Sequence, residues 1–224
     1  MPPNTPHDAL FHAVFSRIEN AAGELRAVLP PAITSRLDWH SLRLADGHYV
    51  DEEFAKSESD LVFAVQAQGQ PALLYVLFEH QSTSDRWMPL RLLRYMIRIW
   101  DRWLKDHLDA KAIPVIVPVV LAHADGGWRA PVSMHELYAL PDDLMSSVAS
   151  CVPQFRFVLD DLSERSDEEL MTRTSQALGI MALLLMRHVR DKQDLSEKFR
   201  EWEALSRAVW GAPDGRAALG MLVR

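Results

Sequence analysis

The stretch Leu73-Leu-Tyr-Val-Leu-Phe-Glu-His-Gln-Ser82 begins with six apolar or aromatic residues and ends in polar ones. A short run of this composition predicts a β-strand that is buried on both faces of a sheet. Because side chains alternate along a strand, Glu79 and Gln81 are expected on one face and His80 on the other. A carboxylate at the end of a buried strand needs either an arginine partner or a metal ion, since an unpaired buried charge is too costly to keep.

The residues that precede this strand predict a partner for it. Leu61-Val-Phe-Ala-Val65 is a second apolar run, and Gly69-Gln-Pro71 provides a turn between the two runs. We therefore expect residues 60–65 and 73–81 to form an antiparallel hairpin. Residues 60 and 79 then lie symmetrically about the turn, so Asp60 and Glu79 are expected to be neighbours in space.

Two carboxylates beside a polar side chain suit a small site for a divalent cation. Mg²⁺ prefers oxygen ligands and keeps several waters, so Asp60, Glu79 and the backbone carbonyl of His80 are sufficient as protein ligands. A metal held in this way can polarise a phosphodiester and activate water near neutral pH. Gln81 cannot act as a base, but its amide can orient the attacking water or a phosphate oxygen.

A helix is predicted from about Met88 to Asp106. Its apolar stripe is expected to consist of Leu90, Leu93, Ile97 and Trp100, and arginines recur at three- and four-residue steps along another face, at Arg91, Arg94, Arg98 and Arg102. These arginines either face a phosphate or carboxylate, or form a solvated surface with local acidic partners such as Asp101 and Asp106. A salt bridge from Arg91 or Arg94 would also satisfy the two strand carboxylates without a metal.

Composition limits the class of protein. The chain has 224 residues, 48% of them hydrophobic, which is enough for one sizeable core. A formal net charge of −7 argues against indiscriminate coating of nucleic acid, so any such contact is confined to a patch. The single cysteine, Cys151, excludes an internal disulfide framework and favours a reducing cytoplasm. Neither a secretory signal nor an apolar run long enough to span a membrane is visible.

Further helices and strands complete an α/β pattern. A first helix is expected from the start near Thr5 until Pro30 stops it. Apolar runs predict strands at residues 113–121 and 155–159, and Pro114 and Pro118 indicate a sheet edge or a bulge in the first of these. A capping box at Ser166 starts a helix that is expected to run to about His188, and another helix is expected from Ser196.

Three blocks of sequence carry a resemblance to a known family. They are Asp60-Leu-Val-Phe63, Tyr75-Val-Leu-Phe-Glu-His-Gln-Ser82 and Met88-Pro-Leu-Arg-Leu-Leu-Arg-Tyr-Met-Ile-Arg-Ile-Trp100. Together they resemble the recombination-promoting nuclease (Rpn) or YhgA-like putative transposase family of the PD-(D/E)XK nuclease superfamily, over roughly residues 7–128. The chain departs from the family pattern at two places. Early in the first helix, where the family has Phe-Lys, this chain has Phe11-His12. After the proline-rich strand, where the family usually has an aromatic residue followed by His-Gly, this chain has Ala122-His123-Ala124.

The resemblance implies a fold and a site. It implies a restriction-endonuclease-like mixed sheet flanked by helices, with Asp60 and Glu79 as metal ligands. It also places Gln81 where the superfamily usually has lysine, which predicts slow turnover because one stabilising positive charge is absent. We expect a nuclease-like domain at residues 1–160 and a helical extension packed on it at residues 161–224.

The expected function is a Mg²⁺-dependent DNA endonuclease that promotes recombination, with Mn²⁺ able to substitute. Arg91, Arg94 and Arg98 are expected to attract the backbone of double-stranded DNA, and a homodimer is allowed. One alternative is a weak or inactive nuclease-fold module that binds DNA or a protein partner. Another is an acidic helical protein that binds a partner through Trp202 and Trp210.

Overall fold

The computed structural model describes residues 6–45, 60–79, 84–123, 126–173, 176–188 and 195–212. Within these ranges, three α-helices precede the first three strands, the fourth and fifth lie between the later strands, and four follow the last strand. The helices are α1 (Pro6–Phe15), α2 (Ile18–Val28), α3 (Pro31–Thr34), α4 (Met88–Asp106), α5 (Asp142–Val148), α6 (Asp167–Met171), α7 (Ala177–His188), α8 (Leu195–Glu201) and α9 (Glu203–Gly211). The strands are β1 (Leu37–Leu44), β2 (Asp60–Ala67), β3 (Gln70–Glu79), β4 (Val115–Ala122) and β5 (Val158–Asp161), and short 3-10 helices are η2 (His135–Leu137), η3 (Ala149–Cys151) and η4 (Leu162–Glu164).

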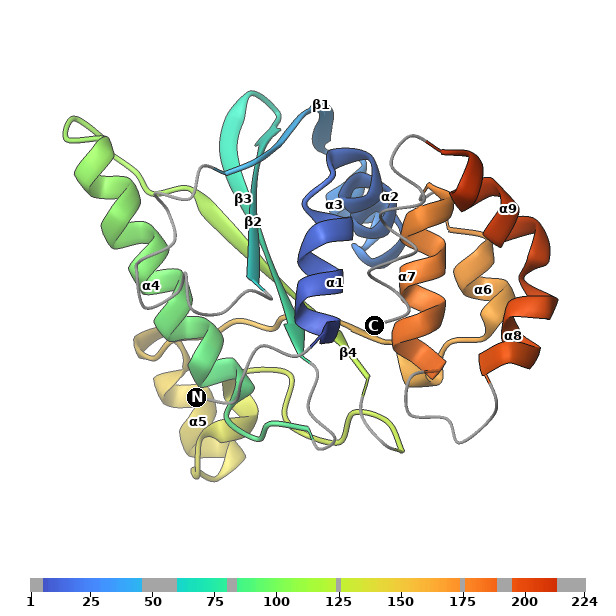
Figure 1. Cartoon of the computed structure of the whole chain (residues 1–224). Helices are drawn as coiled ribbons and strands as arrows, with labels where there is room; N and C mark the ends of the chain where they lie inside the picture. The colour runs from blue at the N-terminus through green and yellow to red at the C-terminus, as the bar shows by residue number, and fades with distance from the viewer. Residues whose placement is uncertain are drawn as a thin grey trace.

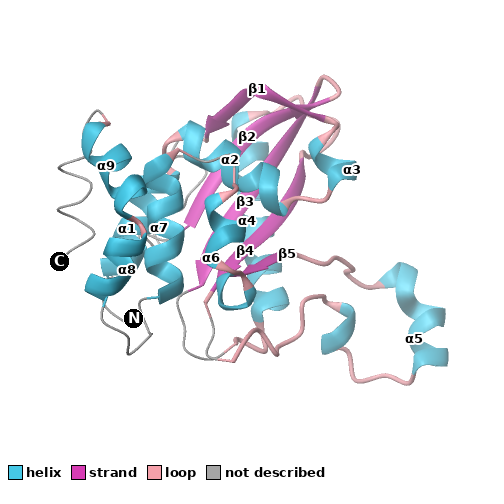
Figure 2. Ribbon diagram, turned by 90° about the vertical axis from the view of Figure 1, so that its right-hand side faces the viewer, coloured by secondary structure: helices cyan, strands magenta, loops and turns pink. Residues whose placement is uncertain are grey.

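The five strands form one mixed sheet in the order β1-β2-β3-β4-β5 (Figure 2). β1, β2 and β3 pair antiparallel, whereas β3, β4 and β5 pair parallel. A parallel neighbour requires a crossover, and α4 supplies the crossover from β3 to β4. The mixed sheet and the hairpin predicted from the sequence are therefore confirmed.

One face of the sheet is covered by α1, α2 and α7 (Figure 1). Buried side chains of these helices, such as Phe11, Leu25 and Met181, pack in a single core with Phe63 of β2 and Leu121 of β4. Because α7 belongs to this core, residues beyond 160 contribute directly to the packing of the sheet. The division of the chain at residue 160 remains a proposal.

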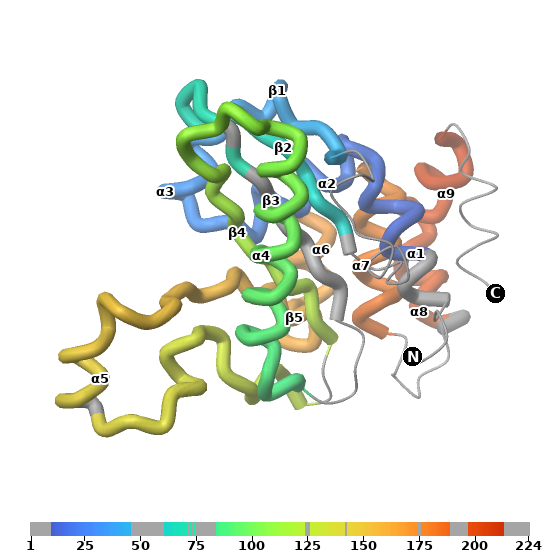
Figure 3. Tube along the Cα trace, turned by 90° about the vertical axis from the view of Figure 1, so that its left-hand side faces the viewer, coloured from blue at the N-terminus to red at the C-terminus, as the bar shows by residue number. Residues whose placement is uncertain are grey.

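The other face of the sheet is covered by α4, which crosses β3 and β4 (Figure 3). The buried residues of α4 are Met88, Pro89, Leu92, Met96 and Ile99. Of the predicted stripe, Trp100 packs against this core, but Ile97 is 46% exposed, so the stripe as a whole is wrong. Apolar residues occur on several sides of this helix, so two stripes fit a helical period. Packing against the sheet determines which of the two stripes is buried.

Several predicted boundaries are also corrected. The first predicted helix is divided at Ser16 and Arg17, where the side-chain amide of Asn20 donates to the carbonyl of Val14 at 2.9 Å. Predicted strand 155–159 begins later, at Val158. Pro118 lies in β4, which has β3 on one side and β5 on the other. Because the pairing of β5 with β4 begins only at Val119, Pro118 has no strand partner on the β5 side and needs no N–H there.

The helix predicted from the capping box to residue 188 is interrupted. The capping box is confirmed at Ser166 and Glu169, but α6 ends at Met171 and α7 begins at Ala177. The helix predicted from Ser196 is likewise divided into α8 and α9 at Trp202. Within the described ranges, no helix combines the length and apolarity that crossing a bilayer requires.

Candidate functional site

The predicted metal ligands Asp60 and Glu79 lie at the ends of two adjacent strands. Asp60 is the first residue of β2, and Glu79 is the last residue of β3. Asp60 pairs with Leu77, so Glu79 lies two residues beyond the position opposite Asp60. The backbone therefore brings the two residues to the same end of the sheet, but the symmetry about the turn expected from the sequence is wrong.

The turn of this hairpin explains the difference in register. Gln68 and Gly69 form a two-residue turn with φ angles of 51° and 80°, and Ala67 pairs with Gln70 across it. A turn of this length with two left-handed residues matches the twist of an antiparallel hairpin. The sequence prediction centred the turn one residue later, and each such displacement shifts cross-strand partners by two residues.

The rest of the predicted metal site falls outside the described part of the chain. His80 and Gln81 are not described, so the carbonyl ligand and the water-orienting amide stay predictions. Among the described residues, no group of three or more His, Cys, Asp or Glu side chains could hold a metal ion. What the structure gives is the backbone framework on which Asp60 and Glu79 are placed.

The arginines of α4 differ in their surroundings. Arg91 is paired with Asp85 at 3.3 Å, and the other oxygen of this carboxylate accepts from the backbone N–H of Trp87 at 2.7 Å. Arg102 pairs with Asp106 at 3.7 Å. Arg94 and Arg98 are exposed. The acidic partner that the sequence suggested is therefore present for Arg102, while Arg91 takes a different partner, before the helix.

Asp161 lies in the same row of the sheet as Glu79, because Ala122 pairs with both residues. Its carboxylate is buried and accepts hydrogen bonds from Ser163, through the backbone N–H at 3.0 Å and the hydroxyl at 2.7 Å, and from the backbone N–H of Trp128. Asp161 therefore joins η4 to the loop after β4. Sequence reasoning missed this role, although two consecutive acidic residues at a strand end signal it.

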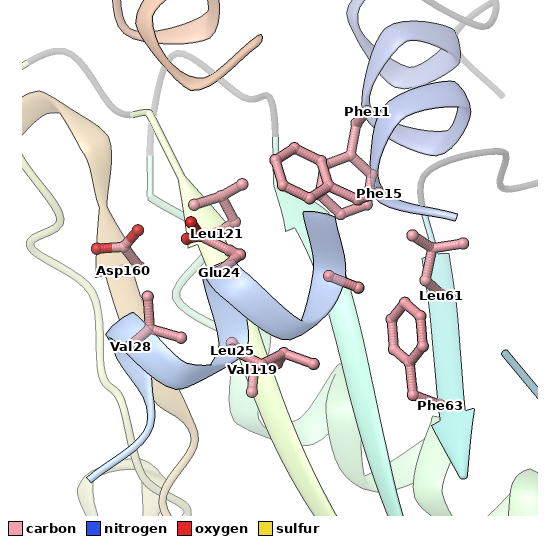
Figure 4. A pocket seen from close by; sticks show the side chains of 11 residues that line it. Phe11, Phe15, Glu24, Leu25, Val28, Leu61, Phe63, Val119, Leu121 and Asp160 are labelled. Carbon is pink, nitrogen blue, oxygen red and sulfur yellow. The ribbon is translucent and has the colours of Figure 1, made fainter. Parts of the chain in front are cut away.

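A buried ionic cluster lies on the opposite face of the sheet and was also missed. It consists of Glu24 on α2, Asp160 on β5 and Arg173 after α6, all with side chains less than a tenth exposed. The Arg173 guanidinium donates to the Asp160 carboxylate at 2.8 and 3.0 Å, and to Glu24. Figure 4 shows Glu24 and Asp160 among the apolar side chains of a cavity of about 20 Å³.

The pKa values of the two carboxyl groups in this cluster are shifted in opposite directions. Burial, and then the charge of Asp160, raise the pKa of Glu24 from 4.5 to about 8. Burial also opposes ionisation of Asp160, but the hydrogen bonds and charge of Arg173 outweigh it and lower the pKa of that carboxyl below 3.8. Glu24 is therefore largely protonated at neutral pH, and Asp160 is ionised.

The tryptophans proposed for partner binding are not equivalent. Trp202 is only 1% exposed and packs against His188 and Phe199, with ring centroids 5.5 and 6.1 Å apart. Its assignment to a partner surface is therefore wrong, because the indole completes the core between α7 and α8. Trp210 is 55% exposed.

These elements define a mixed α/β protein with acidic residues at strand ends and arginines on the crossover helix. The chain matches the family model described as "Putative transposase, YhgA-like" over residues 5–212, and it belongs to this family. No solved structure is significantly similar to the chain.

Relatives with curated names fall into two groups. The Escherichia coli (strain K12) proteins "Recombination-promoting nuclease RpnA" and "Recombination-promoting nuclease RpnC" are each 30% identical, over 84% and 85% of this chain. "Inactive recombination-promoting nuclease-like protein RpnE" from the same organism is 26% identical over 84% of this chain. The chain covers only 62%, 61% and 60% of the lengths of these relatives.

Proposed function

We propose that the chain is a Mg²⁺-dependent DNA endonuclease that promotes recombination. The observation that carries the proposal is the antiparallel pairing of β2 and β3, which brings Asp60 and Glu79 to one end of the sheet. Two similar proteins are named recombination-promoting nucleases. A mixed sheet flanked by helices on both faces also agrees with a restriction-endonuclease-like architecture.

The donor set at the strand ends fits a hard divalent cation. Asp60 and Glu79 carry carboxylates, and the backbone carbonyl of His80 adds a third oxygen, which is the ligand type that Mg²⁺ prefers. A bound ion would supply positive charge against the developing charge of the scissile phosphate. Mn²⁺ is expected to substitute for Mg²⁺ because it accepts the same oxygen ligands.

The chain's own residues would bind and orient the substrate. Gln81 has an amide that can hold the attacking water or a phosphate oxygen, but it carries no charge to replace the usual lysine. Turnover is therefore expected to be slow. Arg94 and Arg98 are exposed on α4 and would attract the DNA backbone. Arg91 lies on the same helix and pairs with Asp85.

A nicking assay on supercoiled DNA with Mg²⁺ or Mn²⁺ tests the proposal. Asp60→Ala and Glu79→Ala should each abolish nicking, while Asp143→Ala, which removes an exposed acid on α5, should leave it unchanged. Gln81→Lys should raise the rate. Equal nicking by the parent and by both site variants would mean that a contaminating nuclease is responsible.

A second function is favoured by the relative named inactive, which is similar over the same share of the chain. In this case the protein keeps the fold and binds DNA without cutting it. Binding by the full chain at low salt, with no nicking by the parent or by Gln81→Lys, would support this module and exclude the endonuclease.

A further inference from the structure

A basic hollow lies on the side of the sheet that α2 covers, opposite α4. Its volume is about 430 Å³, and its lining includes three arginines from separate segments of the chain. Arg26 comes from the last turn of α2, Arg165 follows η4, and Arg173 follows α6. Glu169, Thr172 and Ala27 complete the lining. Three separate segments thus place guanidinium groups around one space that is open to solvent.

The two outer arginines have donors available for a ligand. The Arg165 Nε donates to Asp160 at 2.9 Å, but its two terminal nitrogens make no hydrogen bond to any described residue. The Arg26 guanidinium lies over the Trp39 ring, 4.9 Å from its centroid, and has no acidic partner among the described residues. Stacking holds the planar group in place while leaving its N–H edge open.

The inner arginine is fixed by the buried cluster. The Arg173 side chain is 8% exposed and is held by Asp160 and Glu24, so its positive charge has a fixed position in the lining of the hollow. Glu169 contributes a carboxylate to the lining, but one of its oxygens accepts from the backbone N–H of Ser166 at 2.8 Å in the capping box.

The charges around the hollow do not cancel at neutral pH. Three guanidinium groups face the two carboxylates of Asp160 and Glu169. Glu24 is largely neutral because its pKa is raised to about 8 by burial, and then by the charge of Asp160. One positive charge is left over, in a protein whose formal net charge is −7. A local excess of positive charge in a concave surface attracts small anions.

We propose that this arginine hollow binds a phosphate-class oxyanion. Planar guanidinium groups recognise the oxygens of a phosphate in pairs, and arginines from three segments can approach different oxygens of one group. The phosphate belongs either to a free ion or to the end of a nucleic-acid strand. The site lies on the other face of the sheet from α4 and does not depend on the endonuclease proposal.

Titration of the full chain with inorganic phosphate at constant ionic strength tests the site, with heat of binding and melting temperature as readouts. Saturable binding and a rise in melting temperature are expected for the parent. Arg26→Gln and Arg165→Gln should each weaken binding at least tenfold. Arg26→Lys, which keeps the charge but not the fork of donors, should be intermediate.

Arg207→Gln is the matched control, because it removes one exposed arginine from α9, paired only with Glu203 among the described residues. Equal affinity in the parent, Arg26→Gln, Arg165→Gln and Arg207→Gln would overturn the proposal, as would a response that does not saturate. Each melting shift is read against the variant's own phosphate-free value, so a change in stability is not mistaken for lost binding.

A second comparison distinguishes the sources of the phosphate. A short oligonucleotide is titrated with and without a 5′-phosphate. Tighter binding of the phosphorylated form, lost in Arg165→Gln, assigns the hollow to a strand end. Binding of inorganic phosphate with no effect of the 5′-phosphate assigns it to a free ion. If neither probe binds, the proposal is wrong.

Discussion

Gly127 stands in the loop after β4 with a φ of +83°, which is a left-handed conformation that side chains disfavour. A Cβ at this position would lie 3.0 Å from Oε1 of Glu164 and 3.7 Å from Oδ2 of Asp161. The Glu164 side chain would have to move, next to the carboxylate that joins η4 to the loop. The backbone conformation therefore favours glycine here, and an added Cβ would also crowd the Glu164 carboxylate.

Gly127→Ala is expected to lower the free energy of unfolding by roughly 2 kcal/mol, measured by urea denaturation. Gly69→Ala is the control, because Gly69 has a φ of +80° but no heavy atom within 4 Å of an added Cβ. The control should lose only about 1 kcal/mol, from the backbone conformation alone. Equal losses of unfolding free energy in the two variants would show that crowding around Gly127 adds nothing to the cost of the backbone conformation.

Glu24 gives the protein a pH-dependent stability. The pKa of Glu24 is raised from 4.5 to about 8 by burial, and then by the charge of Asp160. Between these two pH values, Glu24 holds a proton in the folded chain that it has released in the unfolded chain. The stability that Glu24 contributes is therefore fully present below pH 4.5 and is lost as the pH rises toward 8. The slope from this group approaches about 1 kcal/mol per pH unit.

Glu24→Gln should therefore flatten the dependence of unfolding free energy on pH, measured by denaturant titration at several values between pH 5 and 8. Glu19→Gln removes an exposed carboxylate from the same helix and should leave the slope of the parent. If Glu24→Gln keeps the parent's slope, Glu24 is ionised in the folded protein throughout this range.

At the scale of elements, local patterns predicted the hairpin and α4 well, because each is specified by its own residues. Apolar runs separated by a glycine turn define β2 and β3, and the predicted helix has the bounds that α4 has in the structure. The register depended on which residues take left-handed angles, and Gln68 is an uncommon choice for that position.

Long-range contacts account for what the sequence could not predict. Arg173 pairs with Glu24, 149 residues away, and no local spacing connects them. The same contact lies in the segment between α6 and α7, where the sequence pattern predicted one continuous helix. At the candidate metal site, the sequence identified Asp60 and Glu79 by their places at strand ends, whereas the partners of Asp161 emerged only from the folded chain.

The two stripes of α4 can be separated by experiment. Leu92→Ala is expected to cost about 2–5 kcal/mol of unfolding free energy, because Leu92 is fully buried against the sheet. Ile97→Ala should cost less than about 1 kcal/mol, since Ile97 is 46% exposed. Urea denaturation measures both. A larger loss for Ile97→Ala than for Leu92→Ala would restore the apolar stripe that the sequence suggested.

At the scale of the whole molecule, two arginine-bearing surfaces lie on opposite faces of one sheet. The helix α4, which carries exposed arginines, lies on one side of the sheet, and α2 and α6 lie on the other side (Figures 1 and 3). The arginine hollow is lined by residues of α2, of α6 and of the segments next to α6. A net charge of −7 opposes the approach of DNA to the chain as a whole. The proposed binding of DNA must therefore depend on a few localised cations, and that dependence can be measured.

Arg94→Gln and Arg98→Gln should each weaken DNA binding to a similar extent for all sequences, and should lower the slope of log affinity against log salt by about 1. Each arginine that neutralises a phosphate releases roughly one counterion, so the change in slope measures how many phosphates that arginine binds. Fluorescence anisotropy with labelled duplexes over a range of salt concentrations measures the slope. Arg207→Gln, on the far side of the molecule, should keep the parent's slope. If all three variants share that slope, DNA does not bind along α4, and the arginines of this helix serve only its solvation and its ion pairs.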